Sequence, residues 1–86
     1  MVYKVYWKSS ALVDLSKLCS SISTPLKEKI DSYLIKSPQA LGKPLTGKYR
    51  KLYRYRYGDY RVIYELDKKN KLVSVLRIGH RSEIYN

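Results

Sequence analysis

Three arginines lie close together in the segment 51–64, which reads Lys-Leu-Tyr-Arg-Tyr-Arg-Tyr-Gly-Asp-Tyr-Arg-Val-Ile-Tyr. Side chains in a strand alternate between faces, so Arg54 and Arg56 share one face and the intervening tyrosines take the other. Gly58-Asp59 is typical of a hairpin turn, and the second alternating run places Arg61 beside the first two arginines. Guanidinium groups at short range repel one another, and their planar fork matches phosphate. This hairpin predicts either an anion-binding face or, equally well, a solvated basic face beside a tyrosine-rich core.

Composition favours an anionic partner. The chain has 86 residues, enough for a single small domain over residues 1–86, and 18 Lys and Arg against 7 Asp and Glu give it a net charge of +11. Such a charge favours a polyanion, with nucleic acid as the first candidate, or a companion protein that neutralises it. The chain has one cysteine, Cys19, and one histidine, His80, which excludes an internal disulfide and predicts neither a metal site nor a cofactor.

The sequence also predicts where the protein resides. No apolar run reaches the roughly 20 residues of a membrane span, and the N-terminus lacks the apolar core of a secretion signal. The unpaired cysteine agrees with a reducing compartment. We therefore expect a soluble, cytoplasmic protein without a membrane partner.

The N-terminal half predicts a strand followed by two helices. Residues 1–7 alternate as in a half-buried strand, and apolar residues at helical spacing predict a first helix over residues 9–19, capped by Ser9 or Ser10. Residues 20–23 are short and polar and predict a link. Thr24-Pro25 then predicts the start of a second helix, with Thr as N-cap and Pro as the first helical residue.

The C-terminal half predicts the remainder of a sheet. The second helix should end at Ser37-Pro38, and residues 39–47 predict a loop that returns to the sheet. A charged turn at residues 67–71 leads to a strand over residues 72–78, which is apolar on both faces, as is typical of the interior of a sheet, and ends at Gly79. The expected fold is α+β, in the order β-α-α-β-β-β, with a helix hairpin on one face of a mainly antiparallel sheet.

The tail reads Gly79-His80-Arg81-Ser82-Glu83-Ile84-Tyr85-Asn86. Ser82 could cap a last turn that brings Arg81 and Tyr85 near the mouth of the sheet. A lone histidine in a surface turn is more often a solvated or hydrogen-bonding residue than a catalyst. By itself the tail indicates no function.

Together these segments resemble the RelE/ParE superfamily of bacterial toxins from toxin–antitoxin pairs. The resemblance covers nearly the whole chain and depends most on Gly-Asp-Tyr-Arg-Val-Ile-Tyr and on the terminal Gly-His-Arg-x-x-x-Tyr. It implies an acidic antitoxin as partner and one of two activities. RelE-like members are ribonucleases that cut mRNA on the ribosome without a metal, whereas ParE-like members inhibit DNA gyrase. A third interpretation is a nucleic-acid-binding module without chemistry.

The RelE-like branch, which we favour, implies roles for individual residues. RNA cleavage without a metal requires that the 2′-hydroxyl lose a proton, that the pentavalent phosphate be stabilised and that the leaving oxygen be protonated. Arg61 would stabilise the phosphate, Arg81 would stabilise charge or help protonate the leaving oxygen, and Tyr85 would stack on a base. Arg54 and Arg56 occupy the strand on which RelE-type toxins carry basic catalytic residues.

Several residues are candidates for the general base. RelE-like toxins often have lysine on that strand, and lysine can become a usable base among cations, whereas arginine stays protonated. The base would then be His80, Tyr85, Lys51 or Lys48, unless the cluster acts without one; His80 has the most suitable intrinsic pKa. The side chains expected to contact RNA are Lys43, Lys48, Lys51 and Arg77.

Overall fold

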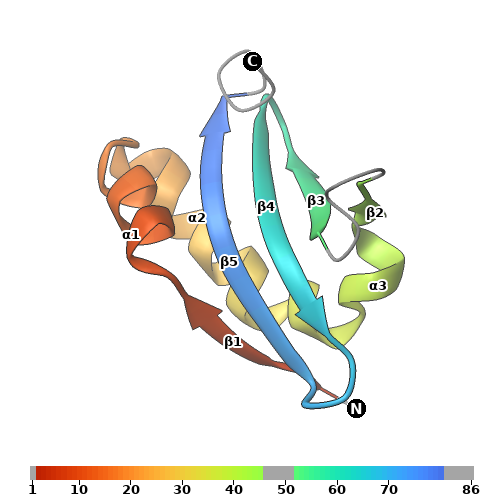
Figure 1. Ribbon diagram of the computed structural model, residues 1–86. Helices are drawn as coiled ribbons and strands as arrows, with labels where there is room; N and C mark the ends of the chain where they lie inside the picture. The colour runs from red at the N-terminus through yellow and green to blue at the C-terminus, as the bar shows by residue number, and fades with distance from the viewer. Residues whose placement is uncertain (1, 46–51, 81–86) are drawn as a thin grey trace.

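The computed structural model describes residues 2–45 and 52–80. Its elements are β1 (Lys4–Trp7), α1 (Ser9–Ser16), α2 (Ser20–Ser32), the 3₁₀ turn η1 (Leu34–Lys36), α3 (Pro38–Leu41), β2 (Lys43–Pro44), β3 (Leu52–Tyr57), β4 (Tyr60–Asp67) and β5 (Leu72–His80). Within these residues the strands form one sheet in the order β1-β5-β4-β3-β2 (Figure 1). Among the described strands, only the β1–β5 pair is parallel. The predicted α+β class with a mainly antiparallel sheet is confirmed.

The core lies between α2 and one face of the sheet. Figure 1 looks onto the opposite face, with α2 behind β4 and β5. Leu26 and Ile30 of α2 are fully buried, and they belong to the same apolar cluster as Tyr64 of β4 and Val75 of β5. Since the helices cover one face, the other face remains available for polar and charged side chains.

The second helix begins earlier than the sequence predicts. It starts at Ser20 with Cys19 as its N-cap, so residues 20–23 are helical and Pro25 lies inside the helix. An apolar stripe with a spacing of four residues consists of Ile22, Leu26 and Ile30. Because the helix already begins at Ser20, Ile22 lies on the same inward-facing side as the other two. Pro25 removes one backbone hydrogen bond near the start of the helix, a cost that the buried stripe offsets. The predictions of a link and of a Thr24 cap were therefore wrong.

Residues 39–47 were predicted as a loop, but their described part, residues 39–45, contains most of α3 and all of β2. The hydroxyl of Tyr64, from the buried face of β4, donates a hydrogen bond to the carbonyl oxygen of Pro38 at the start of α3. A Cβ atom added to Gly42 would lie only 1.9 Å from that hydroxyl oxygen. Glycine at this position therefore leaves room for the tyrosine ring to reach α3. The next residue, Lys43, begins β2 and pairs with Arg54 of β3.

Strand β5 contains an irregularity that decides which way its last residues point. Tyr64 pairs with Val75, but its neighbour Ile63 pairs with Arg77, so Leu76 is an extra residue on β5. A bulge of this kind shifts the alternation of side chains by one position. Ile78, which is 3% exposed, therefore joins Val75 on the helix-covered face. The strand also continues beyond Gly79 to His80, whereas the sequence predicted that it ends at Gly79.

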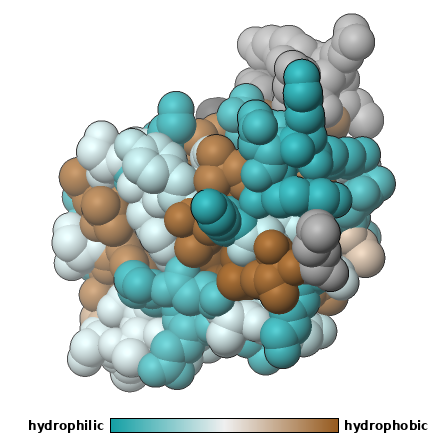
Figure 2. All heavy atoms as spheres, turned by 90° about the horizontal axis from the view of Figure 1, so that it is seen from below, coloured by the Kyte–Doolittle hydropathy of each residue, from teal (hydrophilic) through white to brown (hydrophobic). Residues whose placement is uncertain are grey.

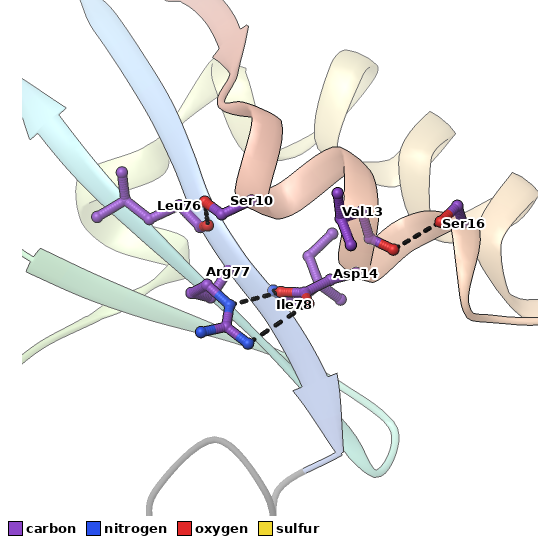
Figure 3. A network of polar contacts seen from close by, with 7 residues as sticks. All are labelled: Ser10, Val13, Asp14, Ser16, Leu76, Arg77 and Ile78. Atoms are coloured by element: carbon purple, nitrogen blue, oxygen red, sulfur yellow. Dashed lines mark hydrogen bonds and ion pairs between the residues drawn. The ribbon is translucent and has the colours of Figure 1, made fainter.

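Helix α1 covers the edge of β5 where β1 has ended. The β1–β5 pairing stops at Val75. Beyond it, the Ser10 hydroxyl donates to the carbonyl oxygen of Leu76 at 2.6 Å, and the backbone N–H of Ile78 donates to the Asp14 carboxylate at 2.9 Å (Figure 3). Side chains of α1 thus satisfy backbone groups that a neighbouring strand would otherwise bind. Ser9 or Ser10 was expected to cap the helix, but Lys8 is the N-cap.

Seen from the end that carries the β4–β5 turn, hydrophilic and intermediate residues surround separate hydrophobic patches (Figure 2). The more exposed large apolar side chains include Val2, Tyr6 and Val13, each more than half exposed. Scattered single exposures of this kind are normal for a small domain. No helix of the described residues is long and apolar enough to cross a membrane.

Candidate functional site

A small cavity on the open face of the sheet brings basic side chains together. It has a volume of about 120 Å³ and is lined by Lys43, Arg54, Arg56 and Arg61, with Leu41 at its side. Arg56 and Arg61 are directly opposite one another on β3 and β4, and Lys43 is opposite Arg54 on β2 and β3. We call this the basic pocket. The strand alternation predicted that the three arginines share a face, and the structure groups them.

The basic pocket has no acidic side chain among its described lining residues. Arg56 Nε donates to the carbonyl oxygen of Gly58, and Arg61 Nη1 donates to that of Tyr60, both at 3.4 Å. Such long contacts with neutral main-chain oxygens orient the guanidinium groups of Arg56 and Arg61 but supply no negative charge. Arg54 and Arg61 are half-buried, so part of their hydration is already lost. The pocket is therefore suited to binding an anion, and the forked donors of arginine match the oxygens of a phosphate.

His80 lies on the other side of the sheet from the basic pocket. It is opposite Tyr60, and the two rings meet edge to face with centroids 5.8 Å apart. Arg61 is instead opposite Gly79, because side chains on neighbouring residues of a strand point to opposite faces. His80 lines a separate, larger cavity at the end of α1. The structure does not bring His80 and Arg61 into one pocket.

Arg77 forms an ion pair with Asp14 of α1 at the edge of the sheet. Its Nε lies 2.7 Å from Asp14 Oδ2, and its Nη2 lies 3.4 Å from Asp14 Oδ1 (Figure 3). The hydrogen bond from Arg77 to Asp14, together with the charge of that carboxylate, raises the pKa of Arg77 above its usual value. The guanidinium is thus directed to α1 and does not line the basic pocket. Sequence reasoning missed Asp14, since 63 residues separate the partners and no motif links them.

Four of the predicted site residues, Arg81, Tyr85, Lys48 and Lys51, lie outside the described residues. Their roles stay predictions. Within residues 2–45 and 52–80, no group of three or more His, Cys, Asp or Glu side chains could hold a metal ion.

Comparison with known proteins assigns the family. Residues 5–85 match the family described as "ParE toxin of type II toxin-antitoxin system, parDE". The chain belongs to this family of toxins. The match includes the hairpin that carries the three arginines and reaches into the tail. The protein is therefore a toxin of the type II toxin–antitoxin class, within the RelE/ParE superfamily that its sequence resembles.

Two relatives of this toxin come from Mycobacterium tuberculosis. Toxin RelE is 35% identical over 83 residues, which are 96% of this chain and 86% of the relative, and Toxin RelG is 34% identical over 85 residues, 99% and 98% of the two chains. The fold is similar to the toxin–antitoxin complex RelBE2 of the same organism, with a TM-score of 0.89 and 32% identity over 94% of this chain and 100% of the other. A mutant of E. coli toxin RelE in the free state has a TM-score of 0.76 and 25% identity, covering 96% and 88%.

The chemistry available to the toxin follows from its basic pocket. Arginine does not give up its proton in proteins, so Arg54, Arg56 and Arg61 can stabilise negative charge but cannot act as bases. Lys43 carries the side chain in the described lining that can exchange a proton. Sequence reasoning gave Lys43 a role in RNA contact alone, since nothing in the sequence showed that β2 pairs it with Arg54.

Proposed function

We propose that this toxin is a ribosome-dependent endoribonuclease that cuts mRNA and so inhibits translation. The observation that carries the proposal is the basic pocket: three guanidinium groups and an ammonium group around a small cavity, with no acid in the described lining. The names of its relatives, Toxin RelE and Toxin RelG, support the RelE-like branch of the superfamily. Cleavage would proceed by attack of the ribose 2′-hydroxyl on the adjacent phosphate, without a metal or other cofactor.

In this proposal the pocket binds the scissile phosphate. The phosphate gains negative charge as the 2′-oxygen attacks, and fixed cations that already surround it stabilise that charge without reorganising. Arg56 and Arg61 are opposite one another and would contact the phosphate from two strands. Arg54 would add charge from the same face, and Lys43 would be placed to exchange a proton with an attacking or leaving oxygen. Arg81 and Tyr85 remain candidates for protonation of the leaving group and for base stacking.

We further propose a cognate acidic antitoxin as partner, in addition to the ribosome and its message. Two observations support this. Relatives of the same fold have been solved as RelBE toxin–antitoxin complexes, and the chain carries a net charge of +11. A partner of opposite charge would neutralise the toxin and associate with it quickly. A reducing cytoplasm, where ribosomes act, would be the place of action.

The proposal is tested by mapping new 5′ ends on cellular transcripts after brief expression of the toxin. We expect cuts inside codons of translated messages. Arg61→Ala should lower the cleavage rate at least ten- to a hundredfold, since a lost charge stabiliser commonly costs a few kcal/mol in the transition state. Lys69→Ala, in the exposed β4–β5 turn, is the matched control and should cut normally. Intact messages in growth-arrested cells would reject the proposal.

A second candidate is inhibition of DNA gyrase, which the match to the ParE family favours. In that function the arginines serve only the fold or the contact with the antitoxin, and no cleavage chemistry is required. The same expression experiment separates the two, because gyrase inhibition yields double-strand DNA breaks with intact messages. A folded Arg61→Ala protein that retains full toxicity would also favour this alternative.

A further inference from the structure

A second cavity lies between the end of α1 and the ends of β4 and β5, and the proposed phosphate chemistry makes no use of it. Its volume is about 420 Å³, which falls within the range of about 300–1,000 Å³ that small ligands usually occupy. It is lined by Lys17, Tyr60 and His80, with the Asp14–Arg77 pair along one wall. We call it the α1–β5 recess. Among the residues that the structure describes, it shares no lining residue with the basic pocket.

The lining of the recess suits a flat, anionic ligand. The Tyr60 and His80 rings, edge to face with an interplanar angle of 81°, offer an aromatic surface, and Tyr60 adds a hydroxyl for hydrogen bonds. Lys17 adds a positive charge. The carboxylate of Asp14 would repel an anion, but it already accepts hydrogen bonds from the Arg77 guanidinium and from the backbone of Ile78 (Figure 3). Aromatic rings beside a cation are the usual platform for an unpaired base and its phosphate.

The position of the recess relates it to the basic pocket. Tyr60 and His80 form one rung of the β4–β5 ladder, and Arg61 and Gly79 form the next. Since side chains on successive rungs point to opposite faces, the two cavities lie on opposite sides of the same end of the sheet. A single strand of RNA that crosses this end could leave one phosphate in the basic pocket and an adjacent base in the recess.

We propose that the α1–β5 recess binds an unpaired nucleotide of the message next to the scissile phosphate, and that it thereby contributes to the choice of the sequence that is cut. The contribution to cleavage rests on the proposed function. The binding of a nucleotide does not, and it can be tested separately.

Binding is tested on the folded toxin by titrating its ¹⁵N-labelled amides with each of the four nucleoside 5′-monophosphates. We expect concentration-dependent shifts at Lys17, Tyr60 and His80, and weaker binding by about fivefold or more in Tyr60→Ala, because a stacked base loses its ring. Tyr33→Ala removes an exposed tyrosine at the end of α2 and is the matched control. The absence of shifts at the recess, or shifts confined to the basic pocket, would overturn the proposal.

The role in sequence choice is tested by sequencing the products of cleavage on programmed ribosomes. We expect Tyr60→Ala and His80→Gln to flatten the base preference beside the cut and to raise the half-saturating concentration about fivefold or more, with a maximal rate within about threefold of wild type. Arg61→Ala should do the reverse, with a lower maximal rate and an unchanged preference. Tyr60→Phe keeps the ring and should retain the preference, which distinguishes stacking from loss of fold.

The outcomes separate the two proposals. A uniform loss of rate with an unchanged base preference in both Tyr60→Ala and His80→Gln would assign the recess a structural role and overturn its part in cleavage. If the wild-type toxin cuts no message, the proposed function fails, and the titration alone decides whether the recess binds nucleotides. If the recess responds only to an antitoxin chain and to none of the monophosphates, it is a protein contact and the proposal is wrong.

Discussion

Arginine occupies three of the four basic positions in the basic pocket, and this choice limits what the pocket can do. A guanidinium group holds two oxygens of a phosphate at once but does not release a proton. In the proposed cleavage, proton transfer must therefore come from another group within hydrogen-bond reach of the reacting oxygens. His80, which the sequence favoured as the base, lies on the opposite face, whereas Lys43 lines the pocket.

This geometry yields a prediction for the pH dependence of cleavage. His80→Gln should leave the shape of the profile of maximal rate against pH unchanged, because its ring does not line the pocket that we propose to bind the phosphate. Lys43→Gln should lower the maximal rate, because it removes the side chain of the described lining that can exchange a proton. Single-turnover rates on ribosome-bound message across pH measure both. If the profile of His80→Gln changes and that of Lys43→Gln does not, the histidine is the base and our placement of the site is mistaken.

Tyr64 provides a residue-scale prediction for stability. Burial, with smaller effects of Tyr53 and Tyr55, raises the pKa of Tyr64 well above its usual value of 10. In the unfolded chain this tyrosine ionises at about pH 10, so below that pH its neutral hydroxyl contributes its full stability to the fold. As the pH rises from about 10 toward the folded-state pKa, that stability is lost, by at most about 1.4 kcal/mol per pH unit. Tyr64→Phe lacks this ionisation, so its free energy of unfolding should fall less steeply above pH 10.

Urea unfolding at a series of pH values measures this effect. At neutral pH, Tyr64→Phe should be less stable than wild type by roughly 0.5–1.5 kcal/mol, because the hydrogen bond to Pro38 is lost. The difference between the two proteins should shrink above pH 10. Tyr6→Phe, at a position that is 55% exposed, is the control and should follow wild type. A constant difference from pH 8 to pH 11 would show that Tyr64 does not titrate with folding.

At the scale of the element, local patterns predicted the sheet well and its irregularities poorly. Alternation in residues 52–66 predicted the β3–β4 hairpin and the common face of its arginines, because that pattern is a property of neighbouring residues. The bulge at Leu76 could not be predicted in this way. It depends on where β4 and α1 hold β5, and it decides that Ile78 and His80 face the helices. The two-residue strand β2 has too little pattern to be recognised at all.

The contact between Gly42 and Tyr64 gives a prediction about the α3–β2 segment. In Gly42→Ala the new methyl group would lie 1.9 Å from the tyrosine oxygen and 3.0 Å from the carbonyl oxygen of Arg54, so the segment must shift. We expect a loss of stability of about 1–3 kcal/mol. Combining Gly42→Ala with Tyr64→Phe removes the nearest atom, so the double variant should be more stable than the sum of the single effects predicts.

Thermal and urea unfolding of the four proteins in this cycle measure the coupling. Ala40→Ser, at an exposed position in α3, is the control and should change stability by less than about 0.5 kcal/mol. If the two changes in the free energy of unfolding are strictly additive, the tyrosine ring does not require glycine at position 42. Since Lys43 follows Gly42 directly and pairs with Arg54, the same shift should also weaken the proposed RNA cleavage.

At the scale of the whole molecule, the dominant feature is charge. A net charge of +11 on 86 residues produces a field that extends beyond any single contact, and it acts on every polyanion and acidic protein that approaches. Composition alone predicted this property, because it depends on the number of charges and hardly on their arrangement. Position matters only where charges converge, as in the basic pocket, or where they are paired, as Arg77 is with Asp14.

The charge predicts how the proposed antitoxin binds. Expressed from its native operon, the toxin should co-elute with a small acidic protein, and the association rate of the two should fall about tenfold or more from low salt to several hundred millimolar, because ions screen the attraction. Stopped-flow mixing of the separated chains measures this rate.

Substitutions test the same prediction. The double variant Lys68→Gln, Lys69→Gln changes two exposed residues of the β4–β5 turn and lowers the net charge by two. It should slow association while leaving dissociation unchanged. Arg61→Gln in the basic pocket should also speed dissociation if the antitoxin covers that pocket. Chains that never co-elute, at low salt as well as high, would reject the acidic partner, and an association rate that does not respond to salt would reject steering by charge.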